Sequence, residues 1–462
     1  MMGISNWLSD FTFSKKSIAP LVVFRILFGM MMLISTMRFI VKGWLQELYI
    51  EPTYFFTYYG FDWVRPFDIY GMYLLYGALI LSAIFITIGL FYRVAISLFF
   101  FAFTYIELID KTNYLNHYYF ISLIAFILLF LPANRSCSVD QHLGFVKRKE
   151  FVPAWNINLI KFQIGLVYFF AGLSKLNYHW LFEAQPLSNW LKHQTDLPFI
   201  GELMQYDFTA YVFSWGGAIF DLMIPFILLN KRFRLVGYIF VILFHTLTSI
   251  MFPIGVFPFV MIVSTLMFFS SAFHEKLLFH LQKLFSWNKN KETKKPEVYR
   301  QKTNKIHVFF IGAYIMLQVL IPLRFLIYSG DLFWTEQGYR FSWRVMLIEK
   351  AGYAQFYVHD AASGNKKLIN TSEYLKPQQE KMMVTQPDMI LQFAHHIRDQ
   401  YSDTIIVEKN GLNVHLESPK ITAEIYVSLF NKGSKLFIDS TVNLSKINRG
   451  FAQKKWILKN EN

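Results

Sequence analysis

Nine apolar runs constrain this chain more than any other feature of its sequence. A helix needs about 20 largely apolar residues to cross the hydrocarbon core of a bilayer. The runs occupy residues 21–40, 69–90, 94–109, 116–132, 157–176, 209–229, 235–252, 254–271 and 306–328. The second and eighth contain no formally charged residue. We therefore predict an all-α, polytopic membrane bundle of about nine transmembrane helices within residues 1–328.

The composition favours a membrane protein over a soluble or nucleic-acid-binding one. Charged residues make up 16% of the chain, against roughly 25% in an average globular chain. Aromatic residues reach 19%, with 50 phenylalanines, and a soluble domain with so much apolar surface would aggregate. The net charge of +14 is spread between the apolar runs, so we expect the lipid bilayer, and no nucleic acid, as a partner. Cys137 is the only cysteine, which excludes an intrachain disulfide.

Lysine and arginine are distributed unequally between alternate connections. If the N-terminus is cytoplasmic, the connections on its side hold far more of them than the opposite connections, many within the segment 273–305. The opposite connections hold only Lys42, Arg65, Lys111 and Lys192. The positive-inside rule predicts such an asymmetry for nine spans. We therefore expect a multi-pass integral membrane protein, in the inner membrane if the source is bacterial, with a cytoplasmic N-terminus and an extracytoplasmic C-terminal end.

The chain becomes polar after residue 328 and its hydrophobic period changes. We predict β-strands near 353–358, 404–409, 421–430 and 434–440. An amphipathic helix is expected over 388–400, with Asp388 as its N-cap. Residues 329–462 are therefore predicted to form a small α+β, β-rich extracytoplasmic domain. The basic segment 273–305 is expected to be a cytoplasmic linker, and the aromatic loop 41–68 an interfacial re-entrant or belt segment.

Ionisable residues within the expected spans are costly in a bilayer and are therefore functional candidates. Lys175, at the outer end of the fifth run, either reaches to the interface or acts as a base, because desolvation favours a neutral amine. His117, level with it, is either a site residue or an interfacial histidine with satisfied hydrogen bonds. Asp221 and His245 lie deeper, and either pair with each other or line a polar cavity. Arg25 lies near the cytoplasmic end, where bracing is commoner than catalysis.

Several familiar site motifs are absent from the sequence. It has no P-loop, no dinucleotide fingerprint, no His-Glu-x-x-His and no cysteine-rich ligand set. His395 and His396 are adjacent, so a helix or strand would point them apart. We therefore expect no metal cofactor, and a buried lysine is the strongest catalytic candidate.

Ordered sequence blocks between about residues 20 and 440 carry a family resemblance. In the first half they are Phe24-Arg25-Ile26-Leu27-Phe28-Gly29, Asp110-Lys111-Thr112, Asn116-His117-x-Tyr119, Ala133-Asn134 with Ser138-Val139-Asp140, and residues 167–176 with Trp180. In the second half they are Trp215-Gly216-Gly217 with Asp221, Phe244-His245, Phe252-x-Ile254-Gly255-x-Phe257, Tyr339-x-Phe341-Ser342-Trp343, and residues 424–428. Together they resemble the vitamin K-dependent gamma-glutamyl carboxylase family, whose membrane module is the HTTM domain. The chain departs from the family at Ser174, where a second lysine is usual, and at Asn177, where aspartate is usual.

The resemblance implies a membrane enzyme that couples two reactions. In the family, a lysine base deprotonates reduced vitamin K, and oxygen adds to generate a much stronger base. This base removes a γ-proton from glutamate, carbon dioxide traps the carbanion, and the quinone leaves as its epoxide. The resemblance implies Lys175 as the base and His117 as the histidine that assists carboxylation. The candidates for a quinone or substrate pocket are Asn116, Tyr119, Trp180, Trp215, Asp221, His245 and Arg25.

The implied cofactor is a reduced vitamin K, menaquinol-like, with oxygen and carbon dioxide as co-substrates. The implied partners are a lipophilic quinol and an exported peptide or protein that contains glutamate. Two alternatives remain open at this point. One is a naphthoquinol epoxidase that carboxylates nothing, and the other is a non-enzymatic membrane module for binding or immunity.

Overall fold

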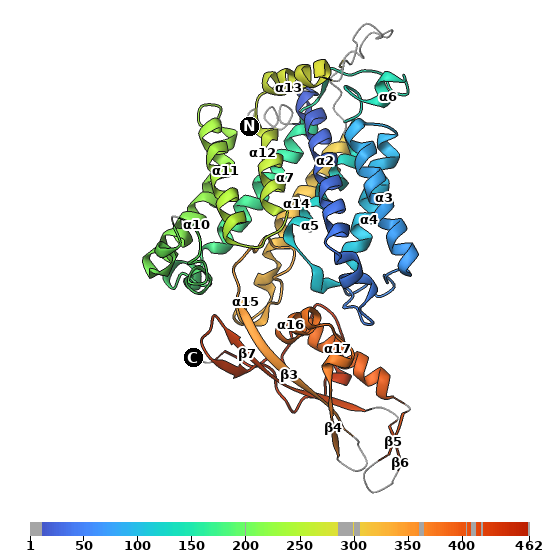
Figure 1. Ribbon diagram of the computed structural model, residues 1–462, viewed down its shortest axis with the longest axis vertical. Helices are drawn as coiled ribbons and strands as arrows, with labels where there is room; N and C mark the ends of the chain where they lie inside the picture. Colours follow the sequence, from blue (N-terminus) through green and yellow to red (C-terminus); the bar gives the residue numbers. More distant parts are fainter. Residues whose placement is uncertain are drawn as a thin grey trace.

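The computed structural model of this chain has two parts, a helical bundle and a smaller C-terminal domain packed against one end of it (Figure 1). It describes residues 12–198, 200–284, 299, 305–359, 365–402, 404–407, 413–416 and 419–460. We call the elements from α15 (Leu332–Thr335) onward the C-terminal domain. The helix α13 (Ser271–Leu284) lies at the opposite end of the bundle (Figure 1). The predicted class, a helical membrane bundle followed by a domain with small sheets, is confirmed, whereas most of the predicted linker 273–305 lies outside the described residues.

Seven helices of the described chain are long and apolar enough to cross a membrane, or eight if the bent pair of α12 and α13 counts as one span. The seven are α2 (Ala19–Val41), α3 (Ile69–Ile88), α4 (Tyr92–Ile109), α7 (Trp155–Lys175), α10 (Asp207–Leu229), α11 (Arg234–Met251) and α14 (Lys305–Leu323). Shorter elements connect them: β1 (Lys15–Ser17), α6 (Val139–His142), β2 (Phe151–Pro153), α8 (Tyr178–Phe182) and α9 (Leu187–Leu191). β1 and β2 pair as a two-stranded antiparallel sheet, and Ser17 of β1 donates its hydroxyl to Glu275 of α13.

Two of the nine predicted runs form helices shorter than a full span. α5 (Asn116–Phe130) has 15 residues, and at 1.5 Å per residue it covers about 22 Å of a hydrocarbon core of about 30 Å. It stops before Pro132, which disfavours helical conformation in the residue preceding it. The eighth run becomes α12 (Phe257–Thr265) with one more 3₁₀ turn, and then bends by 113° into α13. This bend turns α13 across the end of the bundle, an orientation typical of an interfacial helix.

The share of each helix that is buried distinguishes the central helix α7 from peripheral helices such as α14. The apolar stretch of α7 is 61% buried within the protein, whereas that of α14 is only 11% buried. Large apolar side chains such as Phe309 and Phe310 are therefore left on the outer face, 69% and 64% exposed. Exposed apolar surface of this extent is expected where lipid replaces water as the solvent.

The C-terminal domain is built on a four-stranded antiparallel sheet in the order β4-β3-β7-β8. Its strands are β3 (Lys350–His359), β4 (Lys366–Ile369), β7 (Lys420–Leu429) and β8 (Ser434–Leu436), and a separate hairpin pairs β5 (Thr404–Val407) with β6 (Asn413–Leu416). β3 and β7 pair along ten residues, from Lys350 opposite Leu429 to His359 opposite Lys420. The four predicted strand regions overlap β3, β5, β7 and β8, whereas β4 and β6 were not predicted.

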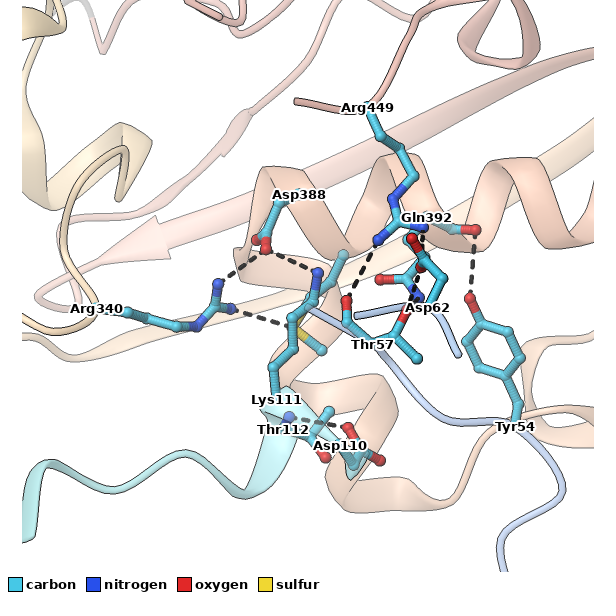
Figure 2. A network of polar contacts seen from close by, with 11 residues as sticks. Tyr54, Thr57, Asp62, Asp110, Lys111, Thr112, Arg340, Asp388, Gln392 and Arg449 are labelled. Atoms are coloured by element: carbon cyan, nitrogen blue, oxygen red, sulfur yellow. Dashed lines mark hydrogen bonds and ion pairs between the residues drawn. The ribbon is translucent and has the colours of Figure 1, made fainter. Parts of the chain in front are cut away.

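Two helices cover one face of this sheet, α16 (Pro377–Thr385) and α17 (Pro387–Tyr401). Alternate residues of the strands are buried against them, and the ring of Phe356 lies 4.9 Å from that of Phe393 on α17. The prediction of Asp388 as the N-cap of α17 is wrong, because Gln386 occupies that position. Pro387 at N1 begins the helix earlier, since its fixed φ suits the first turn. Asp388 therefore lies within the first turn, and its carboxylate faces the bundle (Figure 2).

Candidate active site

The candidate site lies where α7 and α10 approach each other very closely. A Cβ atom added at Gly172 would lie 2.7 Å from both Cγ and the backbone nitrogen of Leu222. Only glycine allows the two backbones to approach so closely. One turn farther along α7, this crossing brings the side chain of Lys175 against α10.

Lys175 and Asp221 form a buried ion pair. The Nζ atom of Lys175 lies 2.5 Å from Oδ2 of Asp221, and each side chain is only 7% exposed. The ammonium also lies 5.4 Å from the centre of the Trp180 ring. Breaking such a pair by removing one partner costs about 3–5 kcal/mol, because a charge is then left buried without compensation. Asp221 therefore pairs with Lys175, and the alternative in which it pairs with His245 is not what the structure contains.

The ion pair opens onto an apolar cavity of about 80 Å³, which is larger than a single water molecule requires. Its walls come from α7, α8, α9, α10, α11, α12, the connection between α11 and α12, and the segment that precedes β3. The residues lining it are Val167, Tyr168, Ala171, Lys175, Trp180, Leu187, Phe213, Gly217, Asp221, Phe244, His245, Thr248, Phe252, Ile254, Phe257, Met261, Val345 and Met346. The cavity thus combines a few polar groups with aromatic and aliphatic walls, as small-molecule sites commonly do.

His245 contributes an unsatisfied polar atom to this cavity. Its Nε2 atom lies 2.8 Å from the hydroxyl of Tyr168, whereas its buried Nδ1 atom has no hydrogen-bond partner among the described residues. Buried polar groups are almost always hydrogen-bonded, so an unsatisfied nitrogen in a cavity wall is a place for a ligand's polar group. Thr248, one turn later, donates its hydroxyl to the carbonyl of His245.

Trp180 forms a rigid wall beside the ion pair. Its indole Nε1 donates to the carbonyl of Ser214 at 2.7 Å, and the Ser214 hydroxyl donates to the carbonyl of Trp180. Asn177 caps the short helix α8 by accepting from the backbone nitrogen of Trp180 at 3.0 Å. Asparagine and aspartate both serve well as N-caps, which gives the departure from aspartate at this position a structural explanation.

Asn116 and Tyr119 hold the loop 336–349, which connects α15 to β3 and reaches the cavity. Asn116 donates to the carbonyl of Arg344 at 3.0 Å, and the ring of Tyr119 stacks on that of Trp343 at 5.0 Å. The loop then contributes Val345 and Met346 to the cavity wall. Four of its residues have positive φ without being glycine, namely Glu336, Phe341, Trp343 and Met346. Such conformations cost of order 1–3 kcal/mol each and persist only where the surrounding contacts enforce them.

The remaining predicted site residues do not line the cavity. His117 is buried, and the ring of Phe257 lies 5.8 Å from its ring and 5.7 Å from that of His245, so an aromatic side chain stands between the two histidines. Trp215 lies on the outer side of α10, where it is 45% exposed and donates to the carbonyl of Leu181. Arg25 is buried near the start of α2, where it donates to the carbonyls of Thr87, Ala133 and Cys137. It braces three segments and does not form part of the cavity.

The block Asp110-Lys111-Thr112 joins the bundle to the C-terminal domain (Figure 2). Lys111 Nζ and an Arg340 nitrogen each lie 2.8 Å from Oδ2 of Asp388. Asp110 accepts from the Gln379 amide of α16 at 2.8 Å. These contacts place the block in the joint between the two parts, beside the loop that walls the cavity.

A second set of polar contacts extends this joint through the aromatic loop 41–68. Arg449 pairs with Asp62 at 2.6 Å, and the Gln392 amide donates to the Thr57 hydroxyl at 3.0 Å (Figure 2). Phe56 is fully buried, whereas Trp63 is 70% exposed. Part of the loop therefore docks the C-terminal domain, and only part of it is left to face lipid.

Burial and neighbouring charges oppose each other in this joint. Burial lowers the pKa of Lys111 to about 8, although Asp388 acts in the opposite direction. Burial alone would raise the pKa of Asp388, but Arg340 and Lys111 hold it well below its ordinary value. Asp388 therefore stays ionised between two cations, as a carboxylate flanked by opposite charges should.

Most of the residues lining the cavity were not in the predicted set, and Tyr168 and Met346 are two of them. Tyr168 precedes Lys175 by seven residues on α7, and residues seven apart share a helix face, so the spacing would have identified it. No comparable signal marks Met346, because its place in the wall depends on the folded loop. Among the described residues, no group of three or more His, Cys, Asp or Glu side chains is arranged to hold a metal ion.

Comparison with known proteins assigns both parts of the chain. Residues 13–273, more than half of the chain, match the family model of the HTTM domain. Residues 303–462 match the model of the vitamin K-dependent gamma-carboxylase lumenal domain. No solved structure matches the chain. The two matches occur in the order in which the bundle and the C-terminal domain occur here, and the chain belongs to the vitamin K-dependent gamma-carboxylase family.

Proposed function

We propose that this protein is a carboxylase-type membrane enzyme in which Lys175 is the base that acts on reduced vitamin K. The observation that carries the proposal is the buried Lys175–Asp221 pair at the wall of an apolar cavity. Reduced vitamin K, when bound, supplies a hydroquinone whose reaction with oxygen yields a base strong enough to act on glutamate. An apolar cavity within the bundle suits a lipophilic quinol, which reaches its site through the bilayer.

The residues of the cavity fit such a cofactor. Phe213, Phe244 and Phe252 offer surfaces for a fused aromatic ring, and the unsatisfied Nδ1 of His245 offers a partner to a ring oxygen. Lys175 and Asp221 stand at the polar part of the wall. The walls also exclude water, which would otherwise quench a strong base.

Lys175 and Asp221 act as one acid–base unit in this proposal. A lysine that carries its full complement of protons cannot accept another, so its proton must first pass from Nζ to Oδ2 of Asp221. Over 2.5 Å this transfer is short, and it replaces two charges by two neutral groups, which an apolar surrounding favours. The neutral amine of Lys175 then accepts the proton of a bound hydroxyl.

The position of the cavity, beside the C-terminal domain, supports the proposal that the enzyme also carboxylates a polypeptide. Val345 and Met346 belong to the matched lumenal-domain region and form part of its wall, so a polypeptide bound to that region can approach the cavity from the C-terminal domain. We propose that the substrate is an exported peptide or protein containing glutamate, and that the C-terminal domain is extracytoplasmic. His117, separated from His245 by Phe257, is proposed to assist carboxylation from the second layer.

The test uses purified protein in lipid nanodiscs with vitamin K hydroquinone, oxygen, labelled bicarbonate and a glutamate-containing peptide. Wild type should form epoxide, and Lys175→Ala should form none. Lys192→Ala is the matched control, because Lys192 is an exposed lysine paired with Asp207 at 2.9 Å and should leave the rate unchanged. Equal epoxide from wild type and Lys175→Ala would refute the assignment of the base. Formation of epoxide without labelling of the peptide would show that the protein is an epoxidase and would refute the proposed carboxylase activity.

A further inference from the structure

An open cavity of about 590 Å³ lies at the end of the bundle opposite the C-terminal domain. It is lined by residues from β1, α2, α7, the connection between α10 and α11, the start of α11, the break between α12 and α13, and the start of α13. The lining residues are Lys16, Pro20, Ile157, Asn158, Lys161, Lys231, Arg234, Leu235, Phe268, Phe269, Ser270 and Ser271. Among these described residues four are cationic and none is acidic.

The cations converge without a counter-charge inside the cavity. The charged groups that act on Lys161 are Arg234 and Lys16, both positive. Lys161 is partly buried in α7 and lies 5.9 Å from the ring of Phe268. Glu275, an acidic residue of α13, accepts from the Ser17 hydroxyl at 2.7 Å and is not part of the lining. Like charges held together in a partly apolar cavity repel one another unless an anion joins them.

Local structure aims these side chains at the cavity. Successive residues of a strand point to opposite faces. Lys15 of β1 lies 3.7 Å from the centre of the Phe151 ring, and Lys16 therefore points the other way, into the cavity. Arg234 is fixed by donating to the carbonyls of Leu228 and Leu229 at the end of α10.

The position of the cavity along the bundle is the one expected for the lipid headgroup region. The apolar helix α12 runs along the bundle (Figure 1). After it, the chain bends by 113° into α13, which runs across the end of the bundle. Phe273 and Phe279 of α13 are 39% and 56% exposed, as expected of a helix that lies in the membrane interface. The turn contributes Phe269, Ser270 and Ser271 to the cavity lining, and Ile157 and Phe268 of the lining belong to the buried core of the bundle.

We propose that this cavity binds the phosphate headgroup of an anionic phospholipid. The cations and the serine hydroxyls meet the phosphodiester, and Leu235, Phe268 and Phe269 contact the start of the acyl chains. Basic pockets between transmembrane helices are suited to anionic headgroups for this reason. The proposal concerns a site separate from the Lys175 cavity and does not depend on the proposed reaction.

Native mass spectrometry of the full chain, released from nanodiscs of equimolar phosphatidylglycerol and phosphatidylcholine, tests the proposal. Wild type should retain phosphatidylglycerol in preference to phosphatidylcholine. The combined variant Lys16→Gln, Lys161→Gln and Lys231→Gln should bind phosphatidylglycerol roughly a hundredfold more weakly, because each cation near a headgroup contributes a several-fold effect. The variant Lys16→Gln, Lys161→Arg and Lys231→Gln keeps one more cation in the cavity and should recover part of the affinity.

The matched control removes three lysines from the same end without touching the cavity: Lys15→Gln, Lys276→Gln and Lys283→Gln. It should retain the lipid like wild type, and an equal loss in both variants would overturn the proposal in favour of general surface charge. Glycerol phosphate and inorganic phosphate are added separately as competitors. Displacement of the lipid by either one at low concentration would show a site for a soluble phosphate and would also overturn the lipid assignment. Circular dichroism and size-exclusion profiles equal to those of wild type establish that the variants are folded.

Discussion

The Lys175–Asp221 pair has separable consequences for stability and for activity. Both side chains are 7% exposed, so neither charge can be hydrated if its partner is removed. Asp221→Asn leaves an ammonium in an apolar wall, and Lys175→Met leaves a carboxylate there. Each change should lower the free energy of unfolding by about 3–5 kcal/mol. The upper bound is set by neutralisation, because keeping an ordinary aspartate protonated at neutral pH costs about 4 kcal/mol.

The double variant Lys175→Met/Asp221→Leu removes both charges and keeps similar side-chain volumes. It should recover most of the lost stability, so that it is more stable than either single variant, because two apolar side chains replace a buried pair without leaving a charge. Its epoxidase activity should nevertheless be absent, like that of both single variants. Chemical denaturation in detergent micelles gives the three free energies, and chromatography of the epoxide gives the activities.

Two outcomes would refute this reasoning. If each single variant loses less than about 1 kcal/mol, the two groups are hydrated and the pair is worth no more than a surface ion pair. If the double variant is as unstable as the sum of the singles, the two side chains are not coupled, and the proposed proton transfer between them has no basis.

Other predictions concern the helix crossing and the joint between the two parts. Gly172→Ala should lower activity roughly a hundredfold, because relieving a 2.7 Å contact separates α7 from α10 by several tenths of an ångström, whereas Gly216→Ala, which meets nothing within 4 Å, should leave the rate near that of wild type. Equal rates in both alanine variants would contradict the proposed crossing. Because the pKa of Asp388 is held below its ordinary value, its contribution to stability is present above about pH 4 and is lost as the pH falls further. Thermal unfolding from neutral to acidic pH should therefore show a steeper loss for wild type than for Asp388→Asn, and parallel curves would show that Asp388 contributes nothing.

The sequence allowed the spans and the candidate groups to be predicted, but not how those groups pair. Rise per residue placed Asp221 and His245 at similar depths, and so their pairing remained one alternative. Depth does not determine which helix faces meet, and Gly172 decides that by allowing α10 to approach the Lys175 face of α7. Asp221 of α10 consequently pairs with Lys175 of α7. His245 of α11 instead contacts the hydroxyl of Tyr168, which also lies on α7.

The loop that walls the cavity was unpredictable for a different reason. Phe341, Trp343 and Met346 all adopt positive φ, which local preferences disfavour for bulky residues. Tertiary contacts enforce these conformations: the backbone nitrogen of Phe341 donates to the Tyr114 hydroxyl, and the Trp343 ring stacks on Tyr119. A conformation that depends on partners more than 200 residues away in the chain leaves no trace in a local pattern.

These contacts also separate the roles of the polar cluster formed by Asp110, Lys111, Asn116 and His117, which lies before α5 and in its first turn. In the sequence, the block Asp110-Lys111-Thr112 stands just before Asn116 and His117, of which only the last two were predicted to be site residues. In the structure, Asp110 and Lys111 hold the helices of the C-terminal domain, while Asn116 holds the loop that supplies Val345 and Met346 to the cavity. Since the cavity is closed by a segment that this cluster positions, disruption of the joint should alter the cavity even though none of its ion pairs reaches Lys175. The joint is therefore the physical connection through which events at the C-terminal domain can affect the proposed base.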